Sequence, residues 1–239
     1  MKKSSIKQLE ASAIIYEDNH LLVVNKAAGQ LVQGDKTGDV PLVDLAKAYL
    51  KEKYQKPGEV FLGVVHRLDR PTSGVIVFAR TSKALTRLNQ QFKERSVKKI
   101  YWAIVEGKNL PKENNLHHWL VRNQKQNKSY AYPKQVPNSK EAKLRFKLHV
   151  VLERYTCLAI ELLTGRHHQI RVQLSAIGHV IKGDLKYGAS RSNKDGSICL
   201  HARSLSLLHP VKKEPIKWTA PPPKDVLWKA CVDAAASSL

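Results

Sequence analysis

Residues 61–79 read FLGVVHRLDRPTSGVIVFA and set two apolar runs around a short polar stretch. The two runs have the composition of strands, and a loop between strands is where a rigid scaffold commonly displays reactive groups. Asp69 stands in this loop with Arg67 and Arg70 on either side, and two positive charges favour an ionised carboxylate. A surface turn with a local ion pair is the simpler alternative, and the rest of the sequence must decide between the two.

The chain is strongly basic. Its 239 residues carry a formal net charge of +21, and the sequence pI is about 9.9. Such an excess of positive charge points to a polyanionic partner, and nucleic acid is the leading candidate. A membrane surface would call for a basic amphipathic helix or a lipid anchor, and neither pattern is found. Lysines that only keep the protein soluble are the other alternative.

Cysteine and histidine give no sign of a disulfide framework or a metal site. Cys157, Cys199 and Cys231 are far apart in the sequence and have apolar neighbours, as buried thiols in a reducing compartment do. The histidine pairs 117–118 and 167–168 are adjacent, so their rings point to different sides of a strand or helix. We therefore expect a cytoplasmic protein without a metal.

The first half of the chain predicts a tail, two helices and several strands. Residues 1–12 are polar and are expected to form a loose tail, followed by one domain over residues 13–239. Asp39 has the character of an N-cap for a helix with an apolar face from Leu42 to Leu50, and Thr81 or Ser82 caps a second helix. Residues 99–106 are apolar at both alternating sets of positions, which indicates a central strand covered on both faces.

The second half predicts more strands. Residues 108–140 are polar and are expected to be loops with one or two short strands, whereas 142–150 alternate as a strand with a basic outer face. That strand should pair with 155–163, and a helix over 167–177, strands at 198–208 and 216–219 and a C-terminal helix from 225 should follow. This order indicates an α+β fold with a mixed, largely antiparallel central sheet flanked by helices and loops, rather than a doubly wound sheet.

Two more constellations could join Asp69. Arg166 lies just before the predicted helix 167–177, and Arg171 lies within it. Arg171 could approach a carboxylate from another loop and fix its rotamer. Solvent-facing arginines are the alternative. Tyr101 on the central strand is either a core residue or, if it faces a cleft, a platform on which a base could stack.

Taken in order, the motifs resemble those of the RluA-type pseudouridine synthases, which isomerise uridine to pseudouridine in RNA. The resemblance covers about residues 16–220 and is carried by six stretches, residues 25–29, 66–74, 99–107, 164–171, 178–184 and 200–202 with 209–210. It implies the pseudouridine synthase fold and an intramolecular transferase that needs no cofactor. The partner would be RNA, with ribosomal RNA favoured over transfer RNA, and nothing demands more than a monomer. An S4 domain, present in many relatives, is not expected.

The resemblance also assigns roles to residues. It implies that Asp69 is the catalytic carboxylate, that Arg171 pairs with it, and that Tyr101 stacks on the uracil. Further residues are expected to contact substrate or RNA, namely Lys26, His66, Arg67, Arg166 and Leu200. Four positions depart from the usual residues of the family, and two of them, His167 and Gln173, are expected to alter RNA contacts; the other two are Ala27 and Val180.

Two other classes of protein stay open. A catalytically silent RNA-binding module of the same fold would need a substitution at Asp69, Tyr101 or Arg171, and none is present. A carboxylate-based glycosidase would need two acidic residues at its pocket, whereas these motifs supply one acid accompanied by arginines.

Overall fold

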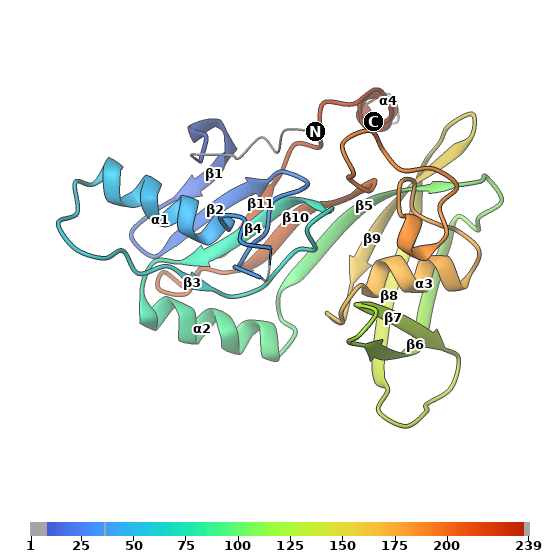
Figure 1. Cartoon of the computed structure of the whole chain (residues 1–239), viewed down its shortest axis with the longest axis horizontal. Coiled ribbons are helices and arrows are strands. Elements are labelled where there is room, and N and C mark those ends of the chain that lie inside the picture. The colour runs from blue at the N-terminus through green and yellow to red at the C-terminus, as the bar shows by residue number, and fades with distance from the viewer. Residues whose placement is uncertain (1–8, 36, 237–239) are drawn as a thin grey trace. The chain divides into compact units, whose positions relative to one another are not determined.

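The computed structural model describes residues 9–35 and 37–236, and the chain divides into two compact units. The first unit comprises Met1–Val97 and Ser204–Pro221, and the second comprises Lys98–Arg203 and Pro222–Leu239. Each unit combines antiparallel strands with two helices (Figure 1). The expected α+β class with a mixed, largely antiparallel sheet is confirmed. The expectation of one domain over residues 13–239 stays a prediction.

The first unit is built on a small antiparallel sheet with a helix packed against it on each side. Its strands are β1 (Ile14–Glu17), β2 (Leu21–Lys26), β3 (Gly63–Val64), β4 (Ser73–Ala79), the end of β10 (Leu200–Leu208) and β11 (Pro215–Thr219). The strand β2 pairs with β1 and β4, and β4 also pairs with β3. Alternate residues of β4, Ile76 and Phe78, join the core beneath α1 (Leu42–Lys53), while α2 (Ser82–Lys93) packs against β3 and β4.

The two helices of this unit begin at different signals. Thr81 caps α2 as expected, because its hydroxyl accepts the Ala84 backbone N–H at 3.2 Å. The expected cap at Asp39 is wrong. The helix α1 begins after Pro41, and the Asp39 carboxylate instead pairs with Arg70 at 2.7 Å. Most of the predicted loose tail, residues 1–8, lies outside the described residues, and Leu9 is buried in the core of the unit.

The second unit has five long or medium strands in the order β5-β9-β8-β6-β7, all paired antiparallel. Their bounds are β5 (Lys98–Glu106), β6 (Glu113–Asn123), β7 (Lys128–Tyr132), β8 (Lys140–Val151) and β9 (Tyr155–Leu162). The structure confirms the covered strand at 99–106 as β5 and the half-exposed strand at 142–150 as β8. It also confirms the pairing of β8 with β9. The region 108–140 is more regular than expected, because β6 and β7 form a hairpin in which Leu116 and Leu120 are buried and polar residues fill most other positions.

Two helices pack against this sheet. The helix α3 (Gln169–Ala176) contacts β6 and β7, and α4 (Val226–Ala236) contacts β8. The helix α3 begins two residues later than predicted because His168 has a φ of 54°, which is outside the helical region. The register places Tyr101 opposite Ile160 on the same face of the sheet as Ala142, which packs with α3.

Candidate active site

Asp69 lies in the loop between β3 and β4 of the first unit and is half-buried. The Thr72 backbone N–H donates to the Asp69 carbonyl at 3.0 Å and closes the loop into a turn. The Gly29 N–H donates to the Arg70 carbonyl at 2.8 Å, and Arg70 Nε donates back to the Gly29 carbonyl at 3.1 Å. Gly29 has a φ of 87°, which a residue without a side chain adopts at little cost. The loop that carries Asp69 is therefore fastened to the loop after β2.

Lys26, the last residue of β2, is fully buried next to these two loops. Its Nζ donates to the carbonyls of Ala27 at 2.9 Å, Gln30 at 2.8 Å and Arg70 at 3.2 Å, so each ammonium hydrogen has an acceptor. Burial lowers the pKa of Lys26 to about 7, while the charge of the nearby Asp69 carboxylate opposes this shift. A fully buried ammonium has no surface for RNA, which argues against the RNA contact expected from the sequence. Lys26 instead holds the Asp69 loop.

The other residues of this loop differ in exposure. His66 is half-buried, stacks on Phe92 of α2 with ring centroids 4.9 Å apart, and accepts the Val77 N–H on Nε2 at 3.2 Å. Arg67 is exposed and makes no hydrogen bond or ion pair with any residue in the described part of the chain. His66 is thus fixed by packing, whereas the Arg67 guanidinium faces solvent and can meet a ligand.

Tyr101 and Arg171 belong to the second unit, where the structure places both on the α3 side of the sheet. Tyr101 is only 8 % exposed and begins the buried run of β5, residues 101–105. Arg171 is 5 % exposed, and its Nε and Nη2 donate to the two carboxylate oxygens of Asp184 at 2.6 and 2.8 Å. Its guanidinium also lies 5.1 Å from the centre of the Tyr187 ring. A bidentate pair of this kind fixes the plane of the guanidinium as well as its position.

A second layer of contacts holds the Tyr187 ring. Its hydroxyl accepts the Ser129 N–H at 2.9 Å and lies 2.9 Å from Nδ1 of His168. Burial, reinforced by the charge of Arg171, lowers the pKa of His168 to about 2, so this imidazole is neutral at ordinary pH. His167 stacks on His168 with ring centroids 3.7 Å apart and lies 2.9 Å from the Ser129 hydroxyl. The polar groups around Arg171 are thus largely satisfied by one another.

The remaining predicted residues are spread over the second unit. Arg166 is half-buried, and its Nε donates to the Glu141 carbonyl at 2.9 Å. Leu200 is buried at the start of β10, as a wall residue would be. Gln173 is fully buried, and its Nε2 donates to the Ala142 carbonyl at 3.2 Å, so the RNA contact expected for it is not supported. The expected pairing of Arg171 with Asp69 stays a prediction.

Asp184 and Tyr187 are the residues that sequence reasoning missed. Asp184 stood in a stretch that supported the resemblance, residues 178–184, but no role was given to it. A signal was nevertheless present. An acidic residue framed by glycines and apolar residues within an otherwise basic chain is a natural partner for a buried arginine.

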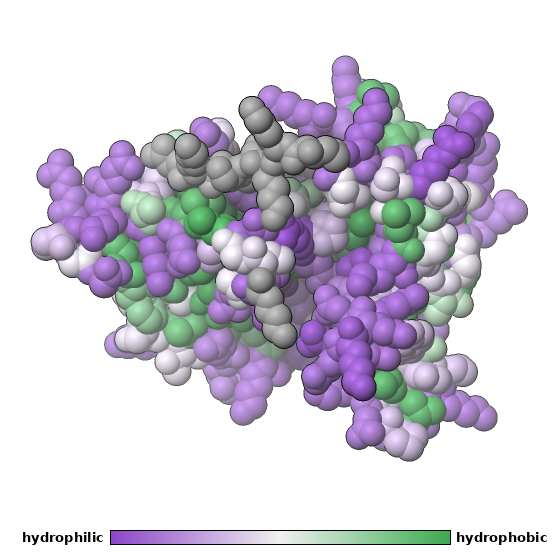
Figure 2. Space-filling model, viewed as in Figure 1, coloured by the Kyte–Doolittle hydropathy of each residue, from purple (hydrophilic) through white to green (hydrophobic). Residues whose placement is uncertain are grey.

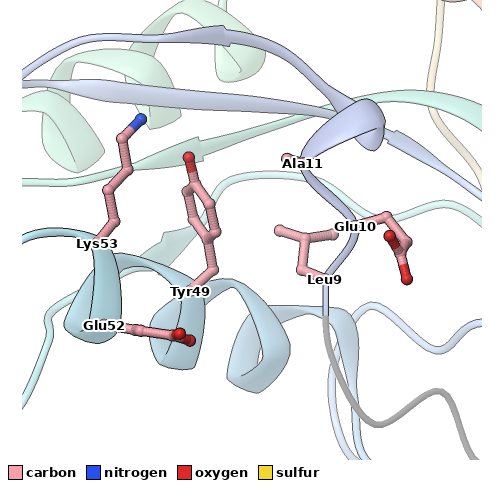
Figure 3. A pocket seen from close by; sticks show the side chains of 6 residues that line it. All are labelled: Leu9, Glu10, Ala11, Tyr49, Glu52 and Lys53. Carbon is pink, nitrogen blue, oxygen red and sulfur yellow. The ribbon is translucent and has the colours of Figure 1, made fainter.

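Other kinds of site receive little support. Among the described residues no group of three or more histidine, cysteine or acidic side chains could hold a metal, and no helix there is long and apolar enough to cross a bilayer. The three cysteines are buried and unpaired by disulfides. A cavity of about 290 Å³ lies between α1 and residues 9–11 (Figure 3). It contains none of the predicted site residues, and two of the side chains that line it, Tyr49 and Lys53, bind Glu17.

Comparison with known proteins gives a consistent result. The family model described as RNA pseudouridylate synthase matches residues 20–176. The chain is 36 % identical over 217 residues to an uncharacterised RNA pseudouridine synthase of Bacillus subtilis, covering 89 % of this chain and 69 % of the relative. It is 33 % identical to ribosomal large subunit pseudouridine synthase C of Vibrio parahaemolyticus, covering 92 % and 68 %.

Solved structures agree at the level of the fold. The human protein RNA pseudouridylate synthase domain containing 4 matches with a TM-score of 0.78 at 23 % identity, covering 94 % of this chain and 93 % of that one. The human protein RNA pseudouridylate synthase domain containing 1 matches with a TM-score of 0.70 at 27 % identity, covering 97 % and 90 %. The fold expected from the sequence is therefore confirmed.

Proposed function

We propose, from the fact that the chain belongs to the RNA pseudouridylate synthase family, that Asp69 is the carboxylate with which it isomerises uridine to pseudouridine in RNA. The observation that carries this assignment is the setting of Asp69. Its loop is fastened by backbone hydrogen bonds, and a buried ammonium lies close enough to interact with its charge. A carboxylate held in this way is aimed at one place, as both nucleophilic and general-base roles require.

The reaction sets the demands on the site. The N1–C1′ bond of uridine breaks, the uracil turns, a C5–C1′ bond forms, the proton on C5 is lost, and N1 takes up a proton. Atoms and electrons balance without a redox partner or water, so the chemistry rests on a carboxylate, a proton acceptor and a dry pocket. Asp69 can attack the sugar, attack the base or deprotonate the sugar at C2′, and each route uses the ionised form.

Tyr101 and Arg171 are proposed as the other catalytic groups. Tyr101 presents a flat ring on which the uracil can stack, an interaction worth about 1–3 kcal/mol per base. Arg171 supplies a positive charge to the carboxylate, and its bidentate pair with Asp184 supports this role by leaving the guanidinium little freedom. Leu200 is proposed as an apolar wall of the pocket. We propose that the two units together form one catalytic domain, since the family match includes residues of both.

The substrate is proposed to be folded RNA, with ribosomal RNA favoured because relatives named for the large ribosomal subunit match most of the chain. A uridine in such RNA must leave its helix, at a cost of a few kcal/mol. The exposed Arg67 is suited to occupy the vacated space, and Arg166 and His66 are proposed to contact the RNA nearby. The protein is proposed to act as a monomer in the cytoplasm, and its buried free thiols favour such a reducing compartment.

The decisive experiment compares Asp69→Asn with Asp44→Asn, an exposed carboxylate on α1. Pseudouridine is mapped in ribosomal RNA from cells that carry each variant, and isomerisation is measured with purified protein. Asp69→Asn should lower the rate by at least about 100-fold without loss of RNA affinity, while Asp44→Asn should behave like the wild type. Normal pseudouridine formation by Asp69→Asn would refute the assignment.

A further inference from the structure

The first unit carries a cluster of basic side chains that the proposed chemistry does not use. They lie on α2, on the turn that ends it and on the turn between β10 and β11. Residues 82–96 and 209–214 contain only two acidic residues, Glu94 and Glu214. The basic residues, called the α2 basic surface below, are Lys83, Arg87, Lys93, Arg95, Lys212 and Lys213.

Hydrogen bonds join the two segments into one surface. Gln91 of α2 accepts the Leu208 N–H on Oε1 at 3.0 Å and donates from Nε2 to the Leu208 carbonyl at 2.9 Å. One turn earlier, Arg87 Nη1 donates to the Pro210 carbonyl at 2.7 Å. The turn that carries Lys212 and Lys213 is thus attached along the side of α2, and hydrophilic side chains project from this part of the molecule in Figure 2.

The charges of this surface are not compensated. Lys93, Arg95, Lys212 and Lys213 are exposed and form no ion pair within residues 9–35 and 37–236. The helix α1 of the same unit offers a contrast, because Lys47 lies 4.0 Å from Asp44 and Lys53 lies 2.9 Å from Glu17. The two helices have equal length but differ in their electrostatic surface. Of the two, α2 is the one that presents uncompensated positive charge to a partner.

The backbone at two of these positions is unusual for the residues that occupy it. Arg95 has a φ of 60° and Lys213 a φ of 59°, in the left-handed region where glycine and asparagine are favoured. Long basic side chains thus occupy positions in both turns where glycine or asparagine would cause less backbone strain. A ligand that uses the two charges would account for both observations.

The surface continues to the Asp69 loop. Phe92, on the last turn of α2, stacks on His66, which directly precedes Arg67. The whole helix has 12 residues and is about 18 Å long at 1.5 Å per residue. We propose that the α2 basic surface binds the phosphodiester backbone of the RNA that flanks the target uridine, an inference that rests on the proposed function. Lysine and arginine side chains that outnumber the acidic ones and form no ion pair are what such a backbone selects.

The test measures binding of a labelled RNA stem-loop with a uridine-rich loop. One double variant combines Lys93→Gln with Arg95→Asn, and another combines Lys212→Gln with Lys213→Asn. Asparagine is chosen at the two left-handed positions because it tolerates that conformation. Each double variant should weaken binding about tenfold at 0.15 M salt and lower the slope of log affinity against log salt by about 1.4, the value for two phosphate contacts to a single strand.

The matched control combines Lys47→Gln with Lys51→Gln on α1, which should bind within twofold of the wild type. All variants change exposed side chains, and thermal unfolding verifies that they fold. Equal affinity and an unchanged salt slope in the α2 variants would overturn the inference. So would a loss of binding to phosphatidylserine vesicles that exceeds the loss for RNA, because that would assign the surface to a membrane.

The outcome can be separated from that of the proposed function. If Asp69→Asn leaves pseudouridine formation intact but the α2 variants bind RNA weakly, the catalytic assignment fails and the RNA surface stands. If Asp69→Asn is inactive and the α2 variants bind like the wild type, only the surface is refuted. In an active enzyme, the α2 variants should raise KM for RNA about tenfold and leave kcat within twofold.

Discussion

The Asp69 loop and the Arg171 cluster solve the same problem, holding a charge in place, by different means. Around Asp69 the supporting charge is the ammonium of Lys26, which is satisfied by three backbone carbonyls. Around Arg171 the supporting group is another side chain, the carboxylate of Asp184, with the Tyr187 ring against the guanidinium. The first arrangement depends on the path of the backbone and the second on a pair of buried opposite charges.

This difference predicts different consequences of mutation. Removing one partner of a buried ion pair leaves the other charge without compensation, which costs far more than the pair contributes. An ammonium that donates to carbonyls leaves neutral acceptors behind when it is removed, but it gives the protein a dependence on pH, because its pKa is well below that of an exposed lysine. Four measurements test the comparison.

The largest effect is expected from Asp184→Asn. Its carboxylate is 1 % exposed and binds a guanidinium that is 5 % exposed, so the substitution leaves a buried positive charge. We expect a loss of about 3–5 kcal/mol in the free energy of unfolding, measured with urea. Asp44→Asn, which breaks an exposed pair with Lys47, should change stability by less than about 1 kcal/mol. Equal effects of the two variants would contradict the distinction drawn here.

The next effect is a pH dependence caused by Lys26. The folded chain releases this proton near pH 7, whereas the unfolded chain keeps it to about pH 10.5, so the unfolded state binds more protons in between. The wild type should therefore gain stability relative to Lys26→Met as the pH rises from 7 to 10, by about 1.4 kcal/mol per pH unit. Parallel curves of stability against pH for the two proteins would show that burial does not lower the pKa of Lys26.

Sequence reasoning identified most of the elements because their patterns are local. The alternation over β8, the covered strand β5 and the Thr81 cap each depend on neighbouring residues, and each is confirmed. The start of α1 was misplaced because Asp39 has a partner 31 residues away, the Arg70 guanidinium. A capping residue and a salt-bridge partner have the same side chain, and only the fold distinguishes them.

The site was predictable in its motifs and not in its supporting contacts. The resemblance implied that Lys26 contacts RNA, yet Lys26 is fully buried next to the loops after β2 and β3, although lysine is rarely buried. Asp184 is 13 residues from Arg171, and the left-handed backbone of His168 that sets where α3 begins has no signal in the sequence. Burial and long-range pairing are properties of the folded chain.

A smaller effect is expected from His168, which tests whether the Arg171 cluster also responds to pH. Burial keeps this imidazole neutral in the folded chain, and the unfolded chain protonates it below about pH 6.5. The wild type should thus lose stability relative to His168→Asn as the pH falls from 6.5 to 4.5. The ideal slope is about 1.4 kcal/mol per pH unit, and we expect about half of it because water screens part of the interaction. Asparagine suits the φ of 54°. No difference in slope would mean that the cluster admits a charged imidazole.

The smallest effect is expected from Asp39→Asn, which removes the carboxylate that binds Arg70 beside the Asp69 loop. The pair is only 2.7 Å apart, but both side chains are substantially exposed, at 41 % for Arg70 and 30 % for Asp39. Such pairs contribute about 0.2–1 kcal/mol, and the contribution should shrink further in 1 M salt, where the Debye length is about 3 Å. Urea unfolding at low and high salt measures both quantities. If this substitution cost as much as Asp184→Asn and salt did not reduce the cost, the Asp69 loop would depend on a side-chain ion pair after all. The backbone carbonyls around Lys26 would then be secondary to it.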